Sequence, residues 1–460
     1  MAKPKDLHRC TDCGATAPRW LGRCTTCDAW GTLEPDPGQG ATTAEALGSA
    51  PDPVMLDSVD VSAALPFPTG VDELDRVLDG GLVPGSVTLL GGEPGVGKST
   101  LVLEVLANAG TPRHPALLVC GEESPGQVRG RAERLEIRRD NVLLLADTDV
   151  DAVCAHAEAV DAGLVVVDSV QTLQSGGCSG SPGTPGQVLA SAQALVEFAK
   201  RTGRSVVLVG HVTKEGDVAG PRALEHVVDT VLSFEGDRRH ALRMLRAHKH
   251  RFGGTDEVGC FEMRRGGLVA LPDPSTRLLE GRPVGVPGSV AAAVLDGARP
   301  LLVEAQALVV PAAAPIARRS GSGVDTARLA LVCAVLEQHA GVRFAGCDVF
   351  AAVTGGVSVT ESGFDLALVL ALASAALEVP IEPYTVVVGE VGLAGELRPV
   401  PRLEQRLREA AHHGFCSALV PAPVPSDLTL AFEAHGLEIV GVGGIAEILH
   451  VLETTDTAAA

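Results

Sequence analysis

The chain has 460 residues, enough for two or three domains, and 46% of them are hydrophobic, which suffices for well-packed cores. Lys and Arg number 37 and Asp and Glu number 57, so the formal net charge is −20 at pH 7. This charge argues against a surface that is positive throughout, although a local basic channel is compatible with it. The sequence shows neither an apolar run of membrane-spanning length nor a secretory signal, so we expect a cytoplasmic protein without a membrane partner.

Four of the eleven cysteines form two Cys-x-x-Cys pairs near the N-terminus, namely Cys10 with Cys13 and Cys24 with Cys27. Two such pairs at this spacing suit one Zn²⁺ ion bound tetrahedrally by four thiolates. Residues 1–35 offer little apolar core, so the metal would hold this small module folded. Because four Cys ligands leave no open position, we expect a structural zinc finger that docks a partner or nucleic acid.

The rest of the chain divides by composition and by the pattern of its elements. Residues 36–56 are rich in Pro, Gly, Ala, Asp and Thr and are predicted to be a linker. Residues 57–275 alternate apolar strands with helical stretches, which predicts a mostly parallel sheet. After a Pro-rich break, residues 286–455 form a second α/β region, and we expect the tail from Glu453 to be disordered. Strands are expected at 86–91, 115–120, 164–168, 205–210, 229–234 and 242–250.

A phosphate-binding loop follows the first of these strands. It has two glycines with four residues between them, then Lys and Ser. The backbone N–H groups of such a loop face a phosphate, and the helix that follows adds a positive dipole end. Lys98 is expected to bind the β- and γ-phosphates and the Ser99 hydroxyl to bind Mg²⁺, so the sequence predicts an ATP–Mg²⁺ site. The loop consists of Gly92, Glu93, Pro94, Gly95, Val96, Gly97, Lys98, Ser99 and Thr100.

Polar residues at the ends of three further strands complete an expected ATPase site. Asp168 ends an apolar strand and would hold the Mg²⁺ ion through water or through Ser99. Glu122 and Glu123 end another strand, and a carboxylate is needed there to orient and deprotonate the attacking water; the residues alone leave the choice between them open. His211 follows a third strand and is expected to sense the γ-phosphate, because ligands of such sheets bind at the carboxyl ends of strands.

The segment from Leu242 to Arg251 predicts a strand that ends in basic residues. Strand alternation places Lys249 and Arg251 on one face and His248 and His250 on the other. Two cations two residues apart suit a pair of fingers that reaches the nucleotide of a neighbouring subunit. The alternative is a solvated basic edge.

These motifs together resemble the bacterial RadA family of DNA repair and recombination proteins, also called Sms, over nearly the whole chain. The most specific family motif is Lys-Asn-Arg-Phe-Gly, which corresponds to residues 249–253 here, with His250 in place of Asn. The resemblance implies an α/β fold: a RecA-like P-loop ATPase core, an N-terminal four-Cys zinc finger and a C-terminal Lon protease-like domain. It also implies that Glu122 is the catalytic base and that Lys249 and Arg251 act in trans.

The resemblance further implies a DNA-dependent ATPase, a motor of the helicase type. Such proteins form homo-hexameric rings that translocate on single-stranded DNA and promote branch migration of branched recombination intermediates alongside the RecA recombinase. Two loops would face the channel of the ring, at residues 173–187 and 212–222, and the second carries Lys214 and Arg222. Neither loop contains an aromatic residue, so DNA contact should be mainly to the backbone and sensitive to salt.

The C-terminal region resembles the Lon protease domain at residues 389–400. Lon-type chemistry needs a Ser nucleophile and a Lys base. The nearest alignment places Phe364 or Asp365 at the nucleophile and Glu404 at the base, and no Lys occurs after Lys249. Arg cannot serve as the base because its pKa is too high. We therefore expect a proteolytically inactive scaffold.

Two other functions compete with the DNA motor. One is an ATP-dependent Lon-like protease, for which Ser362 is the nearest serine to the expected nucleophile. The other is a RecA-fold signalling ATPase, which the pair of carboxylates at Glu122 and Glu123 also resembles. Two tandem ATPase domains would favour the signalling function, whereas the sequence contains a single phosphate-binding loop.

Overall fold

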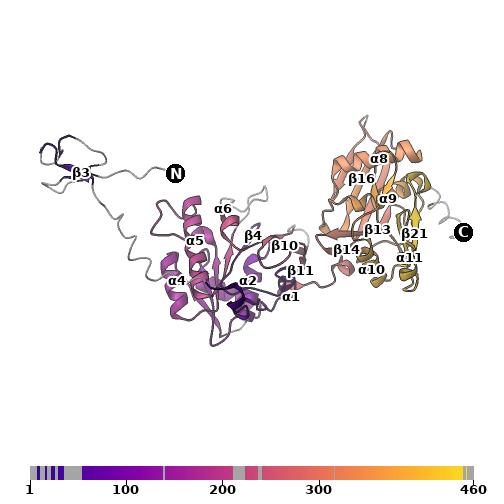
Figure 1. Cartoon of the computed structure of the whole chain (residues 1–460). Helices are drawn as coiled ribbons and strands as arrows, with labels where there is room; N and C mark the ends of the chain where they lie inside the picture. Colours follow the sequence, from indigo (N-terminus) through magenta and orange to yellow (C-terminus); the bar gives the residue numbers. More distant parts are fainter. Residues whose placement is uncertain are drawn as a thin grey trace. The chain divides into compact units, whose positions relative to one another are not determined.

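A computed structural model of the chain is shown in Figure 1, and its residues cluster into two compact units, Met1–Ser62 and Ala63–Ala460. The structure describes residues 8–10, 16–17, 22–25, 29–35, 54–137, 140–210, 223–236, 241–314, 316–448 and 452. Several predictions fall outside these residues: Cys13, Cys27, His211, Lys214, Arg222, residues 36–53 of the linker and the tail from Glu453.

The first unit contains a three-stranded antiparallel sheet in the order β2-β1-β3. Its strands are β1 (His8–Cys10), β2 (Thr16–Ala17) and β3 (Leu33–Pro35). Arg23 and Trp30 form an isolated antiparallel bridge, and the Gly31 N–H donates to the Gly22 carbonyl over 2.9 Å. A 3₁₀ turn, η2 (Leu56–Ser58), follows near the end of the unit.

The second unit begins with a nine-stranded sheet in the order β12-β11-β10-β9-β4-β8-β7-β5-β6. The six strands from β9 to β6 are parallel, and β10, β11 and β12 extend the sheet in antiparallel fashion. The strands are β4 (Val87–Gly92), β5 (Ala116–Cys120), β6 (Val142–Leu145), β7 (Leu164–Asp168), β8 (Ser205–Val209), β9 (Thr230–Glu235), β10 (Leu242–His250), β11 (Val258–Arg264) and β12 (Gly267–Ala270).

Helices cover both faces of this sheet, with α1 and α2 on one face and α4 and α5 on the other (Figure 1). Alternate residues of each strand serve the two cores: Leu90 and Val166 pack toward α2, while Leu89 and Val167 pack toward α5. The helical elements are η3 (Ser62–Ala64), α1 (Asp72–Val77), α2 (Lys98–Ala109), α3 (Pro125–Arg134), α4 (Val150–Ala159), η4 (Val170–Thr172), α5 (Pro185–Thr202) and α6 (Ala223–Val227).

A seven-stranded mixed sheet follows, in the order β15-β16-β14-β13-β17-β20-β21. Its strands are β13 (Ser289–Asp296), β14 (Arg299–Pro311), β15 (Arg319–Ser322), β16 (Cys347–Val353), β17 (Thr385–Val387), β20 (Ser417–Pro421) and β21 (Glu438–Val442). A separate two-stranded ribbon joins β18 (Glu390–Val391) and β19 (Leu397–Arg398).

The helices of this second sheet again pack as two layers, because alternate residues of β13 enter different cores. Val290 and Val294 pack with α8 and α9, whereas Ala291 and Ala293 pack with α10. The helical elements are α7 (Pro274–Leu278), α8 (Thr326–Ala340), η5 (Thr354–Gly356), η6 (Ser362–Phe364), α9 (Asp365–Leu377), α10 (Leu403–His412), α11 (Ser426–Glu433) and η7 (Ile445–Glu447).

The turn between β13 and β14 contacts the nine-stranded sheet through buried polar groups. The Arg299 guanidinium pairs with Glu73 of α1 and donates to the Val258 carbonyl over 2.8 Å. Arg299 is 7% exposed and Glu73 is 1% exposed, so this ion pair is buried. The Ala298 N–H also donates to the Asp256 carbonyl over 2.6 Å.

The six strands expected from the sequence are present to within about one residue at each end. Three strands were missed: β6, whose residues are only partly buried, and the β11–β12 hairpin, which extends the sheet beyond the predicted βα pattern. None of the helices in the described part of the chain combines the length and apolar character that a membrane span needs.

Candidate nucleotide-binding site

The phosphate-binding loop connects β4, which is buried along its length, to α2, which begins at Lys98. Two glycines allow this turn. A Cβ atom on Gly92 would lie 2.5 Å from the Phe234 carbonyl oxygen, and Gly97 has a φ of 122°, in the region that favours glycine. The loop N–H groups and the start of α2 therefore form the anion-binding arrangement that the sequence predicts.

Lys98 is 4% exposed and its ammonium group donates to the carbonyls of Gly92, over 2.6 Å, and Glu93, over 3.0 Å. Burial lowers the pKa of Lys98, and the nearby carboxylates of Asp168 and Glu122 oppose that shift. The ammonium group thus stands between the loop and the two carboxylates, where a bound phosphate would meet it.

Asp168 and Glu122 come together because β7 and β5 are neighbouring parallel strands, with Cys120 paired to Asp168. Burial raises the pKa of Asp168, while a hydrogen bond with the Ser99 side chain acts in the opposite direction. A cavity of about 40 Å³ lies between these groups and is lined by Ser99, Glu122 and Asp168 among others. A hydroxyl beside a carboxylate at a phosphate loop fits Mg²⁺ bound to a nucleotide, because that ion prefers oxygen ligands.

The two adjacent glutamates, which the residue pattern alone left equivalent, have different partners in the structure. The Ser169 hydroxyl donates to the Glu122 carboxylate. Glu123 instead forms an ion pair with Arg131 of α3. The partners of both glutamates were missed in the sequence, although Ser169 directly follows the Asp at the end of the strand. Both glutamates line the cavity, but the carboxylate of Glu123 is engaged by the Arg131 guanidinium, which makes Glu122 the better candidate for the catalytic base.

Lys249 and Arg251 lie near the amino ends of the parallel strands, whereas the phosphate loop follows the carboxyl end of β4. In β10 His250 pairs with Thr230, and Thr230 pairs with Thr88 near the start of β4. The loop follows the other end of β4, five residues beyond its start, or about 16 Å along a strand. The two cations thus lie far from the phosphate loop of their own chain.

Both cations contact α6 or the short segment that joins it to β9. The Lys249 ammonium donates to the carbonyls of Glu225, over 2.8 Å, and Val228, over 2.6 Å. Arg251 pairs with Asp229 over 3.2 Å and remains 52% exposed. The strand has a register shift between Ala247 and Lys249, which simple alternation did not foresee.

The histidines on this strand make contacts of their own. His250 hydrogen-bonds Thr230 over 3.0 Å through Nδ1, and its Nε2 lies 3.3 Å from the Leu78 carbonyl. His248 contacts the Ser233 hydroxyl over 2.8 Å. His250, which replaces the Asn of the family motif, is therefore engaged with its own chain.

The first of the two loops expected to meet DNA is fastened to α5 by a glutamine. Gln187 is 2% exposed; its Nε2 donates to the carbonyls of Cys178, over 2.6 Å, and Gly180, over 3.3 Å, and its Oε1 accepts from the Ser175 N–H. The last three residues of the range 173–187 belong to α5. The composition of this loop gives no sign of the anchor.

The zinc module is described at two of its four cysteines. Cys10 ends β1, and Cys24 is 1% exposed in a turn where its N–H donates to the Ala29 carbonyl over 2.9 Å. Cys13 and Cys27 lie outside the described residues. A buried thiol in a tight turn and a second Cys at the end of a strand fit ligands of a structural Zn²⁺ ion.

The position expected for a protease nucleophile holds an ion pair. The Asp365 carboxylate accepts a hydrogen bond from Arg328 Nε over 2.7 Å, and Phe364 is buried in the core. Ser362 donates to the carboxylate of Glu390 over 2.6 Å. Glu404, at the expected place of the Lys base, pairs with Arg408.

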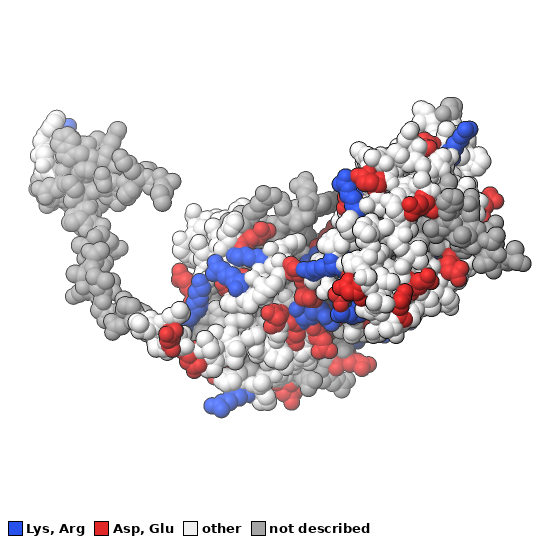
Figure 2. All heavy atoms as spheres, turned by 45° about the vertical axis from the view of Figure 1, so that its right-hand side comes forward, with Lys and Arg blue, Asp and Glu red and all other residues white. Residues whose placement is uncertain are grey.

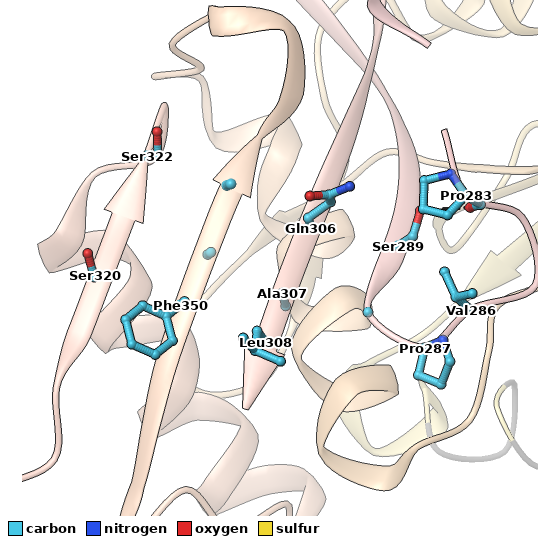
Figure 3. Close-up of a pocket in the computed structure, with 13 residues that line it drawn as sticks. Pro283, Val286, Pro287, Ser289, Gln306, Ala307, Leu308, Ser320, Ser322 and Phe350 are labelled. Atoms are coloured by element: carbon cyan, nitrogen blue, oxygen red, sulfur yellow. Dashed lines mark hydrogen bonds between the residues drawn. The ribbon is translucent and has the colours of Figure 1, made fainter. Parts of the chain in front are cut away.

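A separate pocket of about 330 Å³ opens on the seven-stranded sheet beside β14, β15 and β16. Figure 3 shows Gln306, Ser320 and Phe350 around it. None of its thirteen lining residues is titratable, so the pocket offers no acid, base or metal ligand. It carries none of the predicted site residues.

Three family descriptions match parts of the sequence. Residues 50–217 match an AAA domain, residues 8–35 a rubredoxin metal binding domain, and residues 353–423 subunit ChlI of Mg-chelatase. These matches, together with the sheets described above, confirm the predicted fold class. They also support ATP and Zn²⁺ as the cofactors.

Curated relatives match the chain almost from end to end. It is 44% identical over 461 residues to DNA repair protein RadA of Mycobacterium tuberculosis (strain ATCC 25618 / H37Rv), which covers 99% of this chain and 95% of the relative. It is 44% identical over 457 residues to DNA repair protein RadA of Pseudomonas aeruginosa, with 98% and 100% covered, and 41% identical over 455 residues to that of Bacillus subtilis, with 98% and 99% covered. The AAA domain and these relatives identify an ATP-hydrolysing enzyme. The chain belongs to the RadA family of DNA repair proteins.

Proposed function

We propose that this protein is a DNA-dependent ATPase and translocase that acts in recombinational DNA repair. The observation that carries the proposal is that two groups of predicted site residues lie at opposite ends of the strands of one sheet. Lys98, Glu122 and Asp168 lie at the carboxyl ends of the parallel strands. Lys249 and Arg251 lie at the amino ends of these strands. A complete site then needs two chains, with the cations of one chain reaching the nucleotide bound by the next.

A closed ring satisfies this requirement for every chain, because in a ring of head-to-tail contacts each chain meets one neighbour through each of its two interface surfaces. We propose a homo-hexameric ring with ATP at each subunit boundary. Ser99 and Asp168 would hold Mg²⁺ on the phosphates, and Glu122 would activate the attacking water. His211, which lies outside the described residues, would sense the γ-phosphate.

DNA would pass through the channel of the ring. Lys214 and Arg222 are the proposed contacts, and both lie outside the described residues. The face of the molecule in Figure 2 mixes basic and acidic side chains, so it offers no broad positive surface for DNA. A local channel is consistent with the net charge of −20, and binding to the phosphate backbone would weaken as salt rises.

The repair role rests on the name that these relatives share, DNA repair protein RadA. We propose that the motor promotes branch migration of recombination intermediates together with a RecA-type recombinase. The C-terminal domain would serve ring assembly rather than proteolysis, because Asp365 is engaged with Arg328 and no Lys follows Lys249.

The test is ATP hydrolysis with and without single-stranded DNA, at low and moderate salt, with Lys98→Ala as the blank. Strong stimulation that fades as salt rises is the expected result. A rate indifferent to DNA at both salt concentrations would count against the motor and favour a nucleotide switch. Extension of a branched DNA substrate by the RecA-type recombinase, with and without this protein, tests branch migration.

A further inference from the structure

The last turn of α10 gathers three side chains that are typical metal ligands. Glu409, His412 and His413 are spaced by three and four residues, so they project from the same side of the helix end. One ligand atom from each lies within 4.8 Å of the others, and within the described residues no other such group of His, Cys, Asp and Glu occurs. The His412 and His413 rings stand at 90° with centroids 5.0 Å apart.

A carboxylate from the segment that leads into α7 contacts His413, although it is not one of the three grouped ligands. His413 Nε2 lies 3.3 Å from Asp273 Oδ1 and also 3.3 Å from Glu409 Oε1. Neither contact has hydrogen-bond geometry, so this nitrogen is buried without a hydrogen-bond partner in a side chain that is 11% exposed. Ligands at 2.0–2.1 Å from a tetrahedral zinc ion lie about 3.3–3.4 Å from one another. The distance between His413 Nε2 and Glu409 Oε1 is therefore that of neighbouring ligands around a metal.

Both carboxylates are oriented by groups other than the histidines. The Ser275 hydroxyl donates to Glu409 Oε1 over 2.6 Å, and it accepts from the Leu302 N–H of β14 over 3.0 Å. The Thr276 hydroxyl donates to Asp273 Oδ2 over 2.7 Å. Metal-binding carboxylates in proteins are commonly held by such outer hydrogen bonds. The oxygens are thus fixed in place before any cation arrives.

We propose that Glu409, His412 and His413 bind one Zn²⁺ ion. Two imidazoles with one carboxylate suit zinc, with water in the fourth position, whereas Mg²⁺ and Ca²⁺ prefer oxygen ligands alone. His412 is exposed, so the ion can enter from solvent. The site is separate from the four-Cys module in its ligands and its place in the chain. It would hold the end of α10 in place and stabilise the seven-stranded domain.

The test measures zinc per chain in the full-length protein without a histidine tag. The protein is loaded with ZnCl₂, separated from unbound metal by gel filtration and assayed. Wild type should retain one more zinc ion than His412→Ala and one more than Glu409→Gln. His435→Ala is the matched control, since His435 is an exposed histidine in the turn after α11, and it should retain as much zinc as wild type.

His412→Ala keeps the test independent of folding, because the removed side chain is exposed. Its circular dichroism should match wild type, while its affinity for the added zinc should fall at least ~10-fold. Zinc should raise the thermal midpoint of wild type and leave that of His412→Ala unchanged. Equal zinc content in wild type and His412→Ala would overturn the proposal, as would loss of the same ion from His435→Ala.

Discussion

Asp229 joins Arg251 to the first residue of the strand that leads into the phosphate-binding loop. Its Oδ1 accepts from the Arg251 guanidinium over 3.2 Å, and its Oδ2 accepts from the Val87 N–H over 3.0 Å. The Asp229 side chain is 6% exposed and that of Arg251 is 52% exposed. The buried carboxylate thus orients a guanidinium whose other donors remain available to a neighbouring chain.

Replacing Lys249 by Ala should leave ATP binding intact and reduce hydrolysis in the assembled ring by at least about 10³-fold, the scale of a finger supplied in trans. The reason is that Lys249 lies at the amino ends of the parallel strands, far from the phosphate-binding loop of its own chain. Mixing the variant with wild type should lower the rate by more than the fraction of variant added. A rate that falls only in proportion to that fraction would contradict a role in trans. Arg264→Ala, on the neighbouring strand, is the control.

Lys98→Ala should abolish nucleotide binding or turnover. Its ammonium group is buried between the loop carbonyls and the two carboxylates, and Ala removes a cation placed to meet the β- and γ-phosphates. Binding of a fluorescent ATP analogue and phosphate release measure the effect. Lys200→Ala removes an exposed lysine of α5 and should behave as wild type. Full ATPase activity in Lys98→Ala would overturn the site assignment.

Glu122→Gln should bind ATP normally and hydrolyse it about 10²–10⁴-fold more slowly, since a general base contributes on that scale. Glu123→Gln should keep most of the activity, because that carboxylate pairs with Arg131. Single-turnover hydrolysis of bound ATP distinguishes chemistry from binding. A larger loss in Glu123→Gln than in Glu122→Gln would reverse the assignment.

Much of the nucleotide site was predictable because the positions of the strands follow from buried apolar runs. Runs such as Leu164–Asp168 identify strands that are buried on both faces, and parallel pairing then brings their carboxyl ends to one edge. The same logic placed the carboxylates beside the phosphate loop. The family resemblance, rather than the residue pattern, favoured Glu122 over Glu123.

What the sequence could not supply are contacts between distant side chains. Nothing in the local pattern indicates that Arg131 pairs with Glu123 or that Gln187 fastens a Gly-rich loop. The register shift before Lys249 is a property of how two strands pair and not of either strand alone. Likewise, Asp273 and His413 are 140 residues apart in the chain (413 minus 273), so no spacing rule joins them.

Cys24→Ser should release the zinc of the N-terminal module and loosen residues 1–35, because one thiolate in four is lost from a module whose sequence offers little apolar core. Zinc per chain and proteolytic sensitivity of the N-terminus measure the change. Cys416→Ser, which removes an exposed cysteine of the C-terminal domain, should lose no metal. Unchanged zinc content in Cys24→Ser would show that the four-thiolate site is wrong.

Glu104 of α2 makes the stability of the ATPase core depend on pH. Burial raises the pKa of Glu104 to about 7 from its ordinary 4.5. Because the folded-state pKa is raised, the stability associated with the protonated carboxyl is fully present below pH 4.5 and is lost as the pH rises through 7.

Glu104→Gln keeps a neutral side chain of the same shape at every pH, so it should match wild type near pH 4.5 and exceed it increasingly toward about pH 7. The gap should stop widening above about pH 7, where the Glu104 carboxyl is ionised in both the folded and the unfolded state. Urea unfolding followed by circular dichroism at pH 5, 6, 7 and 8 measures it. Glu133→Gln, on the exposed side of α3, should show no such trend. If the gap between Glu104→Gln and wild type stays constant from pH 5 to 8, the carboxyl titrates normally in the fold and burial does not hold it neutral.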